Sequence, residues 1–84
     1  MTFSVVVEVS LRPGISDPEG ATIERALPAL GFHGITNLQT GKVFRFEVAA
    51  SSEDEAIATA TSIADRLLSN PVIEQSTVRI EVGA

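Results

Sequence analysis

Residues 11–20, LRPGISDPEG, constrain the fold more than any other segment, because one element has to end there and another begin. Pro13 lacks the amide hydrogen that a strand needs, and Gly14 loosens the backbone, so the apolar run before them cannot continue. Asp17 and Pro18 then have the pattern of a helix start, with a carboxylate at the N-cap and proline at the first helical position. The segment therefore predicts a strand, a short loop and a capped helix.

Hydrophobic periodicity extends this prediction along the rest of the chain. Residues 3–11 alternate as a strand with one apolar face, and the helix after Asp17 should be bent at Pro28 and end at Gly31. Residues 34–50 are typical of a hairpin that turns at Thr40-Gly41, with a weak first strand and a clear second strand at 43–48. A capping box at residues 52–55 begins a second helix, which should stop before Asn70-Pro71. Its predicted apolar stripe consists of Ala56, Ile57, Ala60, Ile63, Ala64, Leu67 and Leu68.

A half-buried strand over residues 77–82 completes the order βαββαβ. We expect an α+β, ferredoxin-like fold with an antiparallel or mixed sheet of three or four strands and two helices on one face. In that topology the first strand lies between residues 43–48 and the last strand. Glu8 should then lie on the open sheet face between Arg45 and Arg79, close to Glu47 and Glu81, and form cross-strand ion pairs.

The composition predicts a single small domain, residues 1–84, that associates with other chains. Hydrophobic residues make up 44% of the sequence and charged residues only 20%. A chain of this length buries only roughly 60–65% of its unfolded surface. Some of the apolar surface is therefore expected to contact another chain, and oligomerisation is the usual remedy.

Charge and residue usage exclude several classes of partner and location. The net charge is −5 and the six basic residues are scattered, which argues against a nucleic-acid or anionic-membrane surface. No cysteine is present, so disulfides, thiolate catalysis and thiolate metal sites are excluded. The N-terminus does not resemble a signal peptide, and no apolar run is long enough to span a membrane. A cytoplasmic protein is expected.

The sequence offers little catalytic chemistry. His33 is the only histidine and has no evident acid or nucleophile partner. The acids at residues 53–55 are explained by the helix dipole without a metal ion, and Asp17 and Glu19 would repel a phosphate from the first helix start. On these grounds an accessory subunit and a small-ligand regulatory domain are about equally favoured.

Several segments, in order, carry a resemblance to a known family. They are VEV at residues 7–9 leading into LRPGI-x-DP-x-G at 11–20, residues 23–32, LQTGKVF at 38–44, LLSNPVIE at 67–74, and the final strand. Together they cover nearly the whole chain, which resembles the PurS family, the small subunit of phosphoribosylformylglycinamidine (FGAM) synthase. Arg12 stands where the family usually has lysine, Val43 where an aromatic residue is common, and Pro28 interrupts the first helix.

The resemblance implies a bridging, non-catalytic subunit in de novo purine synthesis. Its partners would be a PurL-type synthetase, which would hold ATP and magnesium, and a PurQ-type glutaminase, which supplies ammonia. The family also implies a homodimer or homotetramer and no cofactor, catalytic residue or metal in this chain. Residues 12–20, Gly41-Lys42 and 70–74 are expected to include partner or dimer contacts. The candidate contact residues are Arg12, Asp17, Lys42, Asn70 and Glu74.

The main alternative is a regulatory module of the ACT type, which shares the βαββαβ topology. Saturable binding of an amino acid, measured by calorimetry, would favour that alternative. A metallochaperone of the same topology is disfavoured because the chain has no cysteine. Fold analogy alone does not decide between these functions.

Overall fold

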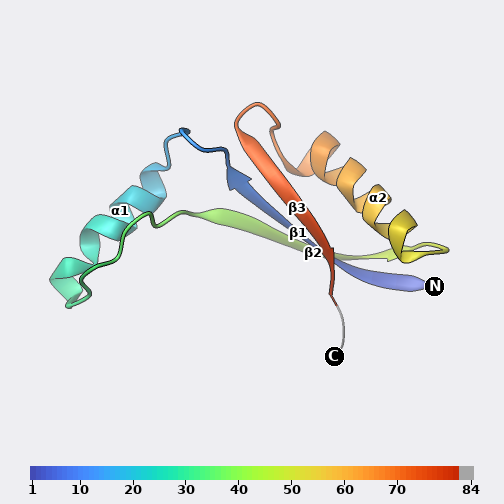
Figure 1. Cartoon of the computed structure of the whole chain (residues 1–84), viewed down its shortest axis with the longest axis horizontal. Coiled ribbons are helices and arrows are strands. Elements are labelled where there is room, and N and C mark those ends of the chain that lie inside the picture. The colour runs from blue at the N-terminus through green and yellow to red at the C-terminus, as the bar shows by residue number, and fades with distance from the viewer. Residues whose placement is uncertain (82–84) are drawn as a thin grey trace.

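The computed structural model describes residues 1–81, which form three strands and two helices (Figure 1). Val82, which the sequence places in the last strand, lies outside the described residues. The elements in chain order are β1 (Thr2–Leu11), α1 (Pro18–Ala26), a 3₁₀ turn (Pro28–Leu30), β2 (Gly41–Ala49), α2 (Glu53–Ile63), a π-helical turn (Ala64–Leu68) and β3 (Glu74–Ile80).

The sheet is antiparallel, and its strand order is β2-β1-β3. The prediction that the first strand lies in the centre is confirmed. Val7 pairs with Phe44 on one side and with Val78 on the other. Directly opposite residues of an antiparallel pair point to the same face, so these three apolar side chains share the face toward α2. An α+β fold with a three-stranded sheet results, as the ferredoxin-like prediction requires.

The core lies between this face and α2, and the residues that form it are small. The strands contribute mainly valines. α2 and the π-helical turn that continues it contribute three alanines spaced four residues apart, which places them on one side of the helix. Alanine leaves little side-chain volume between the helix and the sheet, so α2 can lie close to the strands. The buried core residues are Val5, Val7, Val9, Val48, Ala56, Ala60 and Ala64.

Residues 34–40 form no strand, so the predicted hairpin is wrong in its first half. Because no strand precedes β2 and pairs with it, Thr40-Gly41 is not a hairpin turn. Asn37 and Gly34 have positive φ angles of 58° and 80°, which interrupt an extended backbone. Residues 31–40 instead run back along α1 to the start of β2 (Figure 1).

Only α2 covers the sheet, whereas α1 extends away from it (Figure 1). The expectation of two helices on one face therefore holds for α2 and is wrong for α1. At Pro28 the α-helix gives way to a 3₁₀ turn instead of bending, because proline has no amide hydrogen to donate. Gly31 then adopts φ 90°, and the Phe32 amide donates to the Leu27 carbonyl over 3.1 Å, which completes the predicted helix end.

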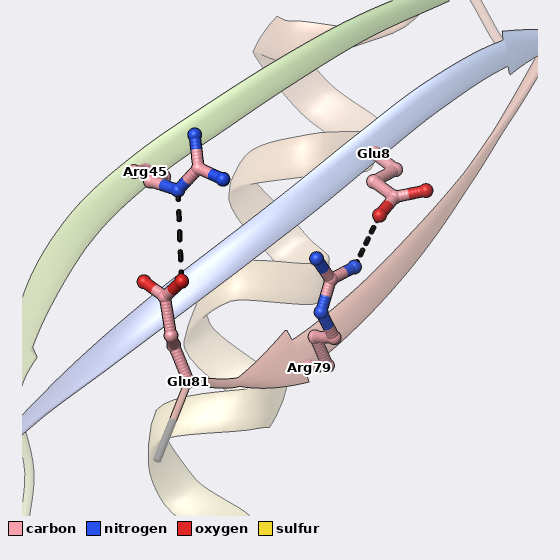
Figure 2. Close-up of polar contacts among 4 residues, drawn as sticks. All are labelled: Glu8, Arg45, Arg79 and Glu81. Carbon is pink, nitrogen blue, oxygen red and sulfur yellow. Dashed lines mark hydrogen bonds and ion pairs between the residues drawn. The ribbon is translucent and has the colours of Figure 1, made fainter. Parts of the chain in front are cut away.

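The opposite sheet face carries cross-strand ion pairs, as predicted (Figure 2), but Val6 and not Glu8 lies between Arg45 and Arg79. Arg79 pairs with Glu8, and Arg45 Nε lies 3.8 Å from Glu81 Oε1. All four side chains remain about half exposed. Val6 lies between Arg45 and Arg79 in register and is fully buried. We attribute its burial to the aliphatic stems of these arginines, since long charged side chains cover apolar surface while their charged ends stay in water.

Candidate interaction surfaces

The described residues give no support to a metal site or a membrane span. Within residues 1–81, no three histidine or acidic side chains are placed to share a metal ion. Glu55 accepts hydrogen bonds from the backbone and hydroxyl of Ser51, and Ser52 caps α2 by accepting from the Glu55 amide over 3.1 Å. His33 lies in an exposed loop. In the same part of the chain, neither helix combines the length and apolarity needed to cross a bilayer.

Asp17 joins the start of α1 to the start of β2. Its carboxylate accepts from the Gly20 amide at 2.9 Å, from the Thr40 amide at 2.7 Å and from the Thr40 hydroxyl at 2.9 Å. The bond from the Thr40 backbone, followed by that from Gly20, lowers the pKa of Asp17 below its usual value of 3.8. Asp17 is thus the predicted N-cap and also a link between two segments that are distant in the sequence.

Glu24 makes a second link of the same kind. Its carboxylate accepts from the Leu38 amide over 2.8 Å, so α1 is bound to the returning segment at two points along its length. Gly20 permits this close approach, because a Cβ atom there would lie 2.8 Å from the Leu38 carbonyl oxygen. We call residues 13–40 the arm. Its two legs, α1 and residues 31–40, are held together before any partner binds.

Lys42 and Glu74 line one open groove at the base of the arm. The groove has a volume of about 420 Å³ and lies beside the last residues of β1. Lys42 pairs with Val9 and Glu74 pairs with Leu11, so both side chains are on the α2 side of the sheet. The other polar side chains that line it are Ser10, Glu19 and Thr40. The structure therefore brings together two of the five candidate contact residues here.

Arg12, Asn70 and Glu74 meet in a second place, where the chain turns into β3. The Arg12 amide donates to the Ile73 carbonyl over 2.8 Å, and Arg12 Nε donates to the Pro71 carbonyl over 2.9 Å. The Asn70 carbonyl accepts from the amides of Ile73 and Glu74, and the Asn70 amide donates to Glu74 Oε1 over 2.7 Å. We call Arg12 with residues 67–74 the corner. Glu74 belongs to both the corner and the groove.

The sequence did not locate the apolar side chains that the corner and the arm expose. Leu67 was expected in the buried stripe of the second helix, but it is 80% exposed. The wider π-helical turn changes the angular position of each residue and directs Leu67 outward. Val72, in the corner, is 79% exposed. The high apolar content was the available signal, but it did not locate these residues. On the arm, the exposed large apolar residues are Ile15, Ile23, Leu30, Phe32 and Ile35.

A family model described as PurS, phosphoribosylformylglycinamidine (FGAM) synthase, matches residues 4–82. The chain belongs to the PurS family. A PurS subunit of this synthase from Mycobacterium leprae is 42% identical over 76 residues, which cover 90% of this chain and 92% of the relative. The PurS subunit of Archaeoglobus fulgidus is 38% identical over 72 residues, or 86% of this chain and 90% of the relative.

Solved structures of PurS proteins have the same fold. The crystal structure of the Thermotoga maritima PurS subunit superposes with a TM-score of 0.89 at 33% identity, covering 96% of this chain and 93% of that one. A chain in the structure of PurLQS from the same organism also gives a TM-score of 0.89, at 32% identity, and covers 96% of this chain and 99% of that one. Membership of the PurS family, rather than the shared topology, decides against the ACT-type alternative.

Proposed function

We propose that this chain is the PurS-type small subunit of FGAM synthase and bridges a PurL-type synthetase and a PurQ-type glutaminase. The observation that carries the proposal is the match to the PurS family over residues 4–82. The structure of PurLQS from Thermotoga maritima also supports the proposal, because one of its chains has the fold described above. In this role the chain supports the glutamine- and ATP-dependent conversion of formylglycinamide ribonucleotide to the amidine in purine synthesis.

The chain contributes contacts to this ligase, and the chemistry belongs to its partners. We assign ATP and magnesium to the synthetase, and we assign no cofactor and no catalytic residue to this chain. The hydrogen bonds of its carboxylates support the assignment. Backbone amides donate to the side chains of four acidic residues: Asp17, Glu24, Glu55 and Glu74. Such bonds fix the side chain, which suits a structural role. We place the protein in the cytoplasm with the other purine-synthesis enzymes.

A second copy of this chain is the partner we propose for the arm. The described residues have a radius of gyration of 16.3 Å, whereas a compact chain of this length has about 12 Å. The excess comes from the arm, which leaves Leu30 70% and Phe32 58% exposed to water in the isolated chain. Large apolar side chains on a pre-shaped arm favour a homodimer, or a dimer of dimers, in which a neighbouring copy covers them.

Reconstitution tests the bridging role. The purified chain is mixed with a PurL-type synthetase and a PurQ-type glutaminase, and the product that forms from glutamine is measured with and without the chain. We expect its omission to abolish both stable assembly and glutamine-dependent turnover. Turnover fed directly with ammonium should persist, because the synthetase then needs no glutaminase. Full glutamine-dependent turnover and assembly without the chain would contradict the proposal.

A further inference from the structure

The outer edge of β2 is open in the isolated chain. Within residues 1–81, the strand order β2-β1-β3 places β2 at one side of the sheet, with no strand beyond it. β2 is nine residues long and pairs with β1 without a bulge from Gly41 to Ala49. A regular edge of this length presents a row of backbone donors and acceptors to which another strand can add.

The register of the sheet shows which backbone groups lie on this edge. The Ala50 amide donates to the Met1 carbonyl over 2.9 Å, and these two residues are opposite each other in the register that pairs Thr2 with Ala49. Bonded and non-bonded pairs alternate along an antiparallel ladder, so the even-numbered residues of β2 use their backbone groups on β1. The odd-numbered residues direct theirs away from the sheet, and these are Val43, Arg45, Glu47 and Ala49.

The side chains of this edge match those of a second copy of the same strand. A two-fold contact is reciprocal, so every residue pair in it occurs twice. One antiparallel register places Arg45 of each copy opposite Glu47 of the other, which forms two pairs of opposite charge on the open face. On the α2 side, the same register places Phe46 opposite Phe46 and Phe44 opposite Val48. These residues belong to the core or pack against it, so the core continues across the axis.

Neighbouring registers lack this match. A shift by one residue places outward backbone groups of one strand opposite inward groups of the other. A shift by two residues places Arg45 opposite Arg45, or Glu47 opposite Glu47, and like charges directly opposite each other are destabilising. Larger shifts no longer bring Arg45 opposite Glu47. The charges therefore favour one register and oppose its nearest alternatives, whereas an edge that is only protected from aggregation needs no such order.

The side chains of this edge are accessible to a second copy. Arg45 is 63% exposed, and its Nε lies 3.8 Å from Glu81 Oε1, which is longer than a hydrogen bond. Its guanidinium can therefore donate to a second carboxylate. Glu47 and Ala49 are exposed as well, and Val43 is 52% exposed although it is apolar. In the matched register Val43 lies opposite Ala49 of the second copy, which covers part of its surface.

We propose that the edge of β2 pairs with the edge of β2 in a second copy about a two-fold axis at Phe46, with Arg45 opposite Glu47 of the second copy. The two sheets then form one sheet in the order β3-β1-β2-β2-β1-β3. The inference rests on the self-association in the proposed function, since a second copy is also the partner proposed for the arm. The arm ends where β2 begins, so the two contacts use adjacent parts of the chain.

Charge exchange between purified variants tests the proposal. Arg45→Glu places two acids opposite Glu47, and Glu47→Arg places two bases opposite Arg45. Each variant alone should have a dissociation constant for self-association that is roughly tenfold weaker or more. An equimolar mixture of the two variants should associate as the wild type does, because each pair across the axis is then again of opposite charge. Analytical ultracentrifugation measures the association of each sample.

Arg79→Glu is the matched control. Arg79 lies on the same open face as Arg45, pairs with the same residue of β1 and also has a carboxylate partner, but it belongs to β3. Its reversal changes the net charge and the intrachain ion pair equally, and it should leave self-association unchanged. An equal weakening in Arg79→Glu, or a mixture that dissociates as readily as its two components, would overturn the proposed register.

A proline at an outward position tests the backbone contact. Val43→Pro removes an amide hydrogen that faces away from β1, so the chain should keep its fold and lose association. Phe44→Pro removes an amide that faces β1 and should reduce the stability of the chain itself. Circular dichroism and urea unfolding distinguish the two effects. A folded Val43→Pro that associates as strongly as the wild type would overturn the pairing of the edges.

The outcomes separate this contact from the arm and from the bridging role. If arm variants dissociate but the edge variants associate normally, the edge contact is rejected and the arm remains. If the wild-type chain is monomeric at high concentration, both contacts between copies are rejected. Reconstitution with the synthetase and the glutaminase tests the bridging role separately, so its failure would leave a measured edge contact in place.

Discussion

Single carboxylates and glycines determine how the arm is built. Asp17 is the clearest case, because one side chain caps α1 and also binds Thr40. Asp17 was singled out from the sequence as a contact residue, and the N-cap pattern was also recognised there. The contact with Thr40 could not be predicted, because it depends on the path by which residues 31–40 run back along α1 to β2. The role of Asp17 toward a partner stays a prediction.

The lowered pKa of Asp17 makes a prediction about pH. A carboxyl group whose pKa is lower in the folded state stabilises the fold above its unfolded pKa and loses that contribution as the pH falls through the folded value. We expect the free energy of unfolding to decrease on acidification below about pH 4, near the usual carboxyl pKa. Asp17→Asn should show a shallower decrease. Urea titrations at several pH values measure this, with Asp54→Asn on the first turn of α2 as the control. An equally steep decrease in Asp17→Asn would contradict the prediction.

The sign of the stability change in Gly20→Ala tests whether the arm requires the close approach at Gly20. Glycine to alanine within a helix normally stabilises a protein by about 0.5–1 kcal/mol. At Gly20 a Cβ atom would lie 2.7 Å from Asp17 Oδ2 and 2.8 Å from the Leu38 carbonyl oxygen. Gly20→Ala should therefore destabilise the fold, by about 1–3 kcal/mol, as measured by urea unfolding. Ala21→Gly, one residue on, should cost only the usual helix propensity. A stabilised Gly20→Ala would show that the arm does not require this close approach.

At the scale of elements, the central strand organises both faces of the sheet. Its alternating pattern predicted which residues face the core and which face the open side, since each residue on a strand has its face set by a period of two. The strand order was predicted from the βαββαβ topology. The pattern did not predict the burial of Val6, which depends on arginine stems from both neighbouring strands. The middle of β1 is therefore shielded from water on both faces of the sheet.

The Glu8–Arg79 pair should contribute little as a charge pair. A double-mutant cycle of Glu8→Gln and Arg79→Gln should give a coupling of about 0.2–1 kcal/mol, because both side chains are half exposed. The coupling should decrease in high salt. Arg79→Ala should cost more than Arg79→Gln, because alanine also removes the stem that covers Val6. Equal costs would refute the account of Val6, and a coupling above about 2 kcal/mol would refute the weak-pair prediction.

Two segments differ from expectation, residues 34–40 and α1, and each differs for its own reason. Residues 34–40 have only a weak strand pattern, and in the described residues no strand pairs with the outer edge of β2, where the hairpin would have placed them. The apolar stripe of α1 and of the 3₁₀ turn after it, with Ile23, Leu27 and Leu30, is equally consistent with an intramolecular core and with a surface between chains. Periodicity shows that a helix has an apolar side, but it does not show which molecule covers that side.

At the scale of the whole molecule, the arm predicts self-association. Leu30→Glu and Phe32→Glu place a charge where a second copy is proposed to pack, so each should shift the protein toward monomer. Ala58→Glu, at an exposed position on α2, is the control and should leave the association state unchanged. Analytical ultracentrifugation over a range of concentrations measures the shift. A wild-type chain that stays monomeric at high concentration, or arm variants that associate normally, would contradict the role of the arm.

The position of β1 in the sheet has a consequence for synthesis. The first strand to leave the ribosome is the central one, and its partners come later: Val5 pairs with Phe46 and with Ile80. Contacts between residues so distant in sequence form slowly. Until β2 and β3 have been synthesised, β1 is an apolar ribbon with unpaired edges, which is the kind of segment that chaperones protect from aggregation. The sheet can therefore be completed only once residues 74–80 of β3 have been synthesised.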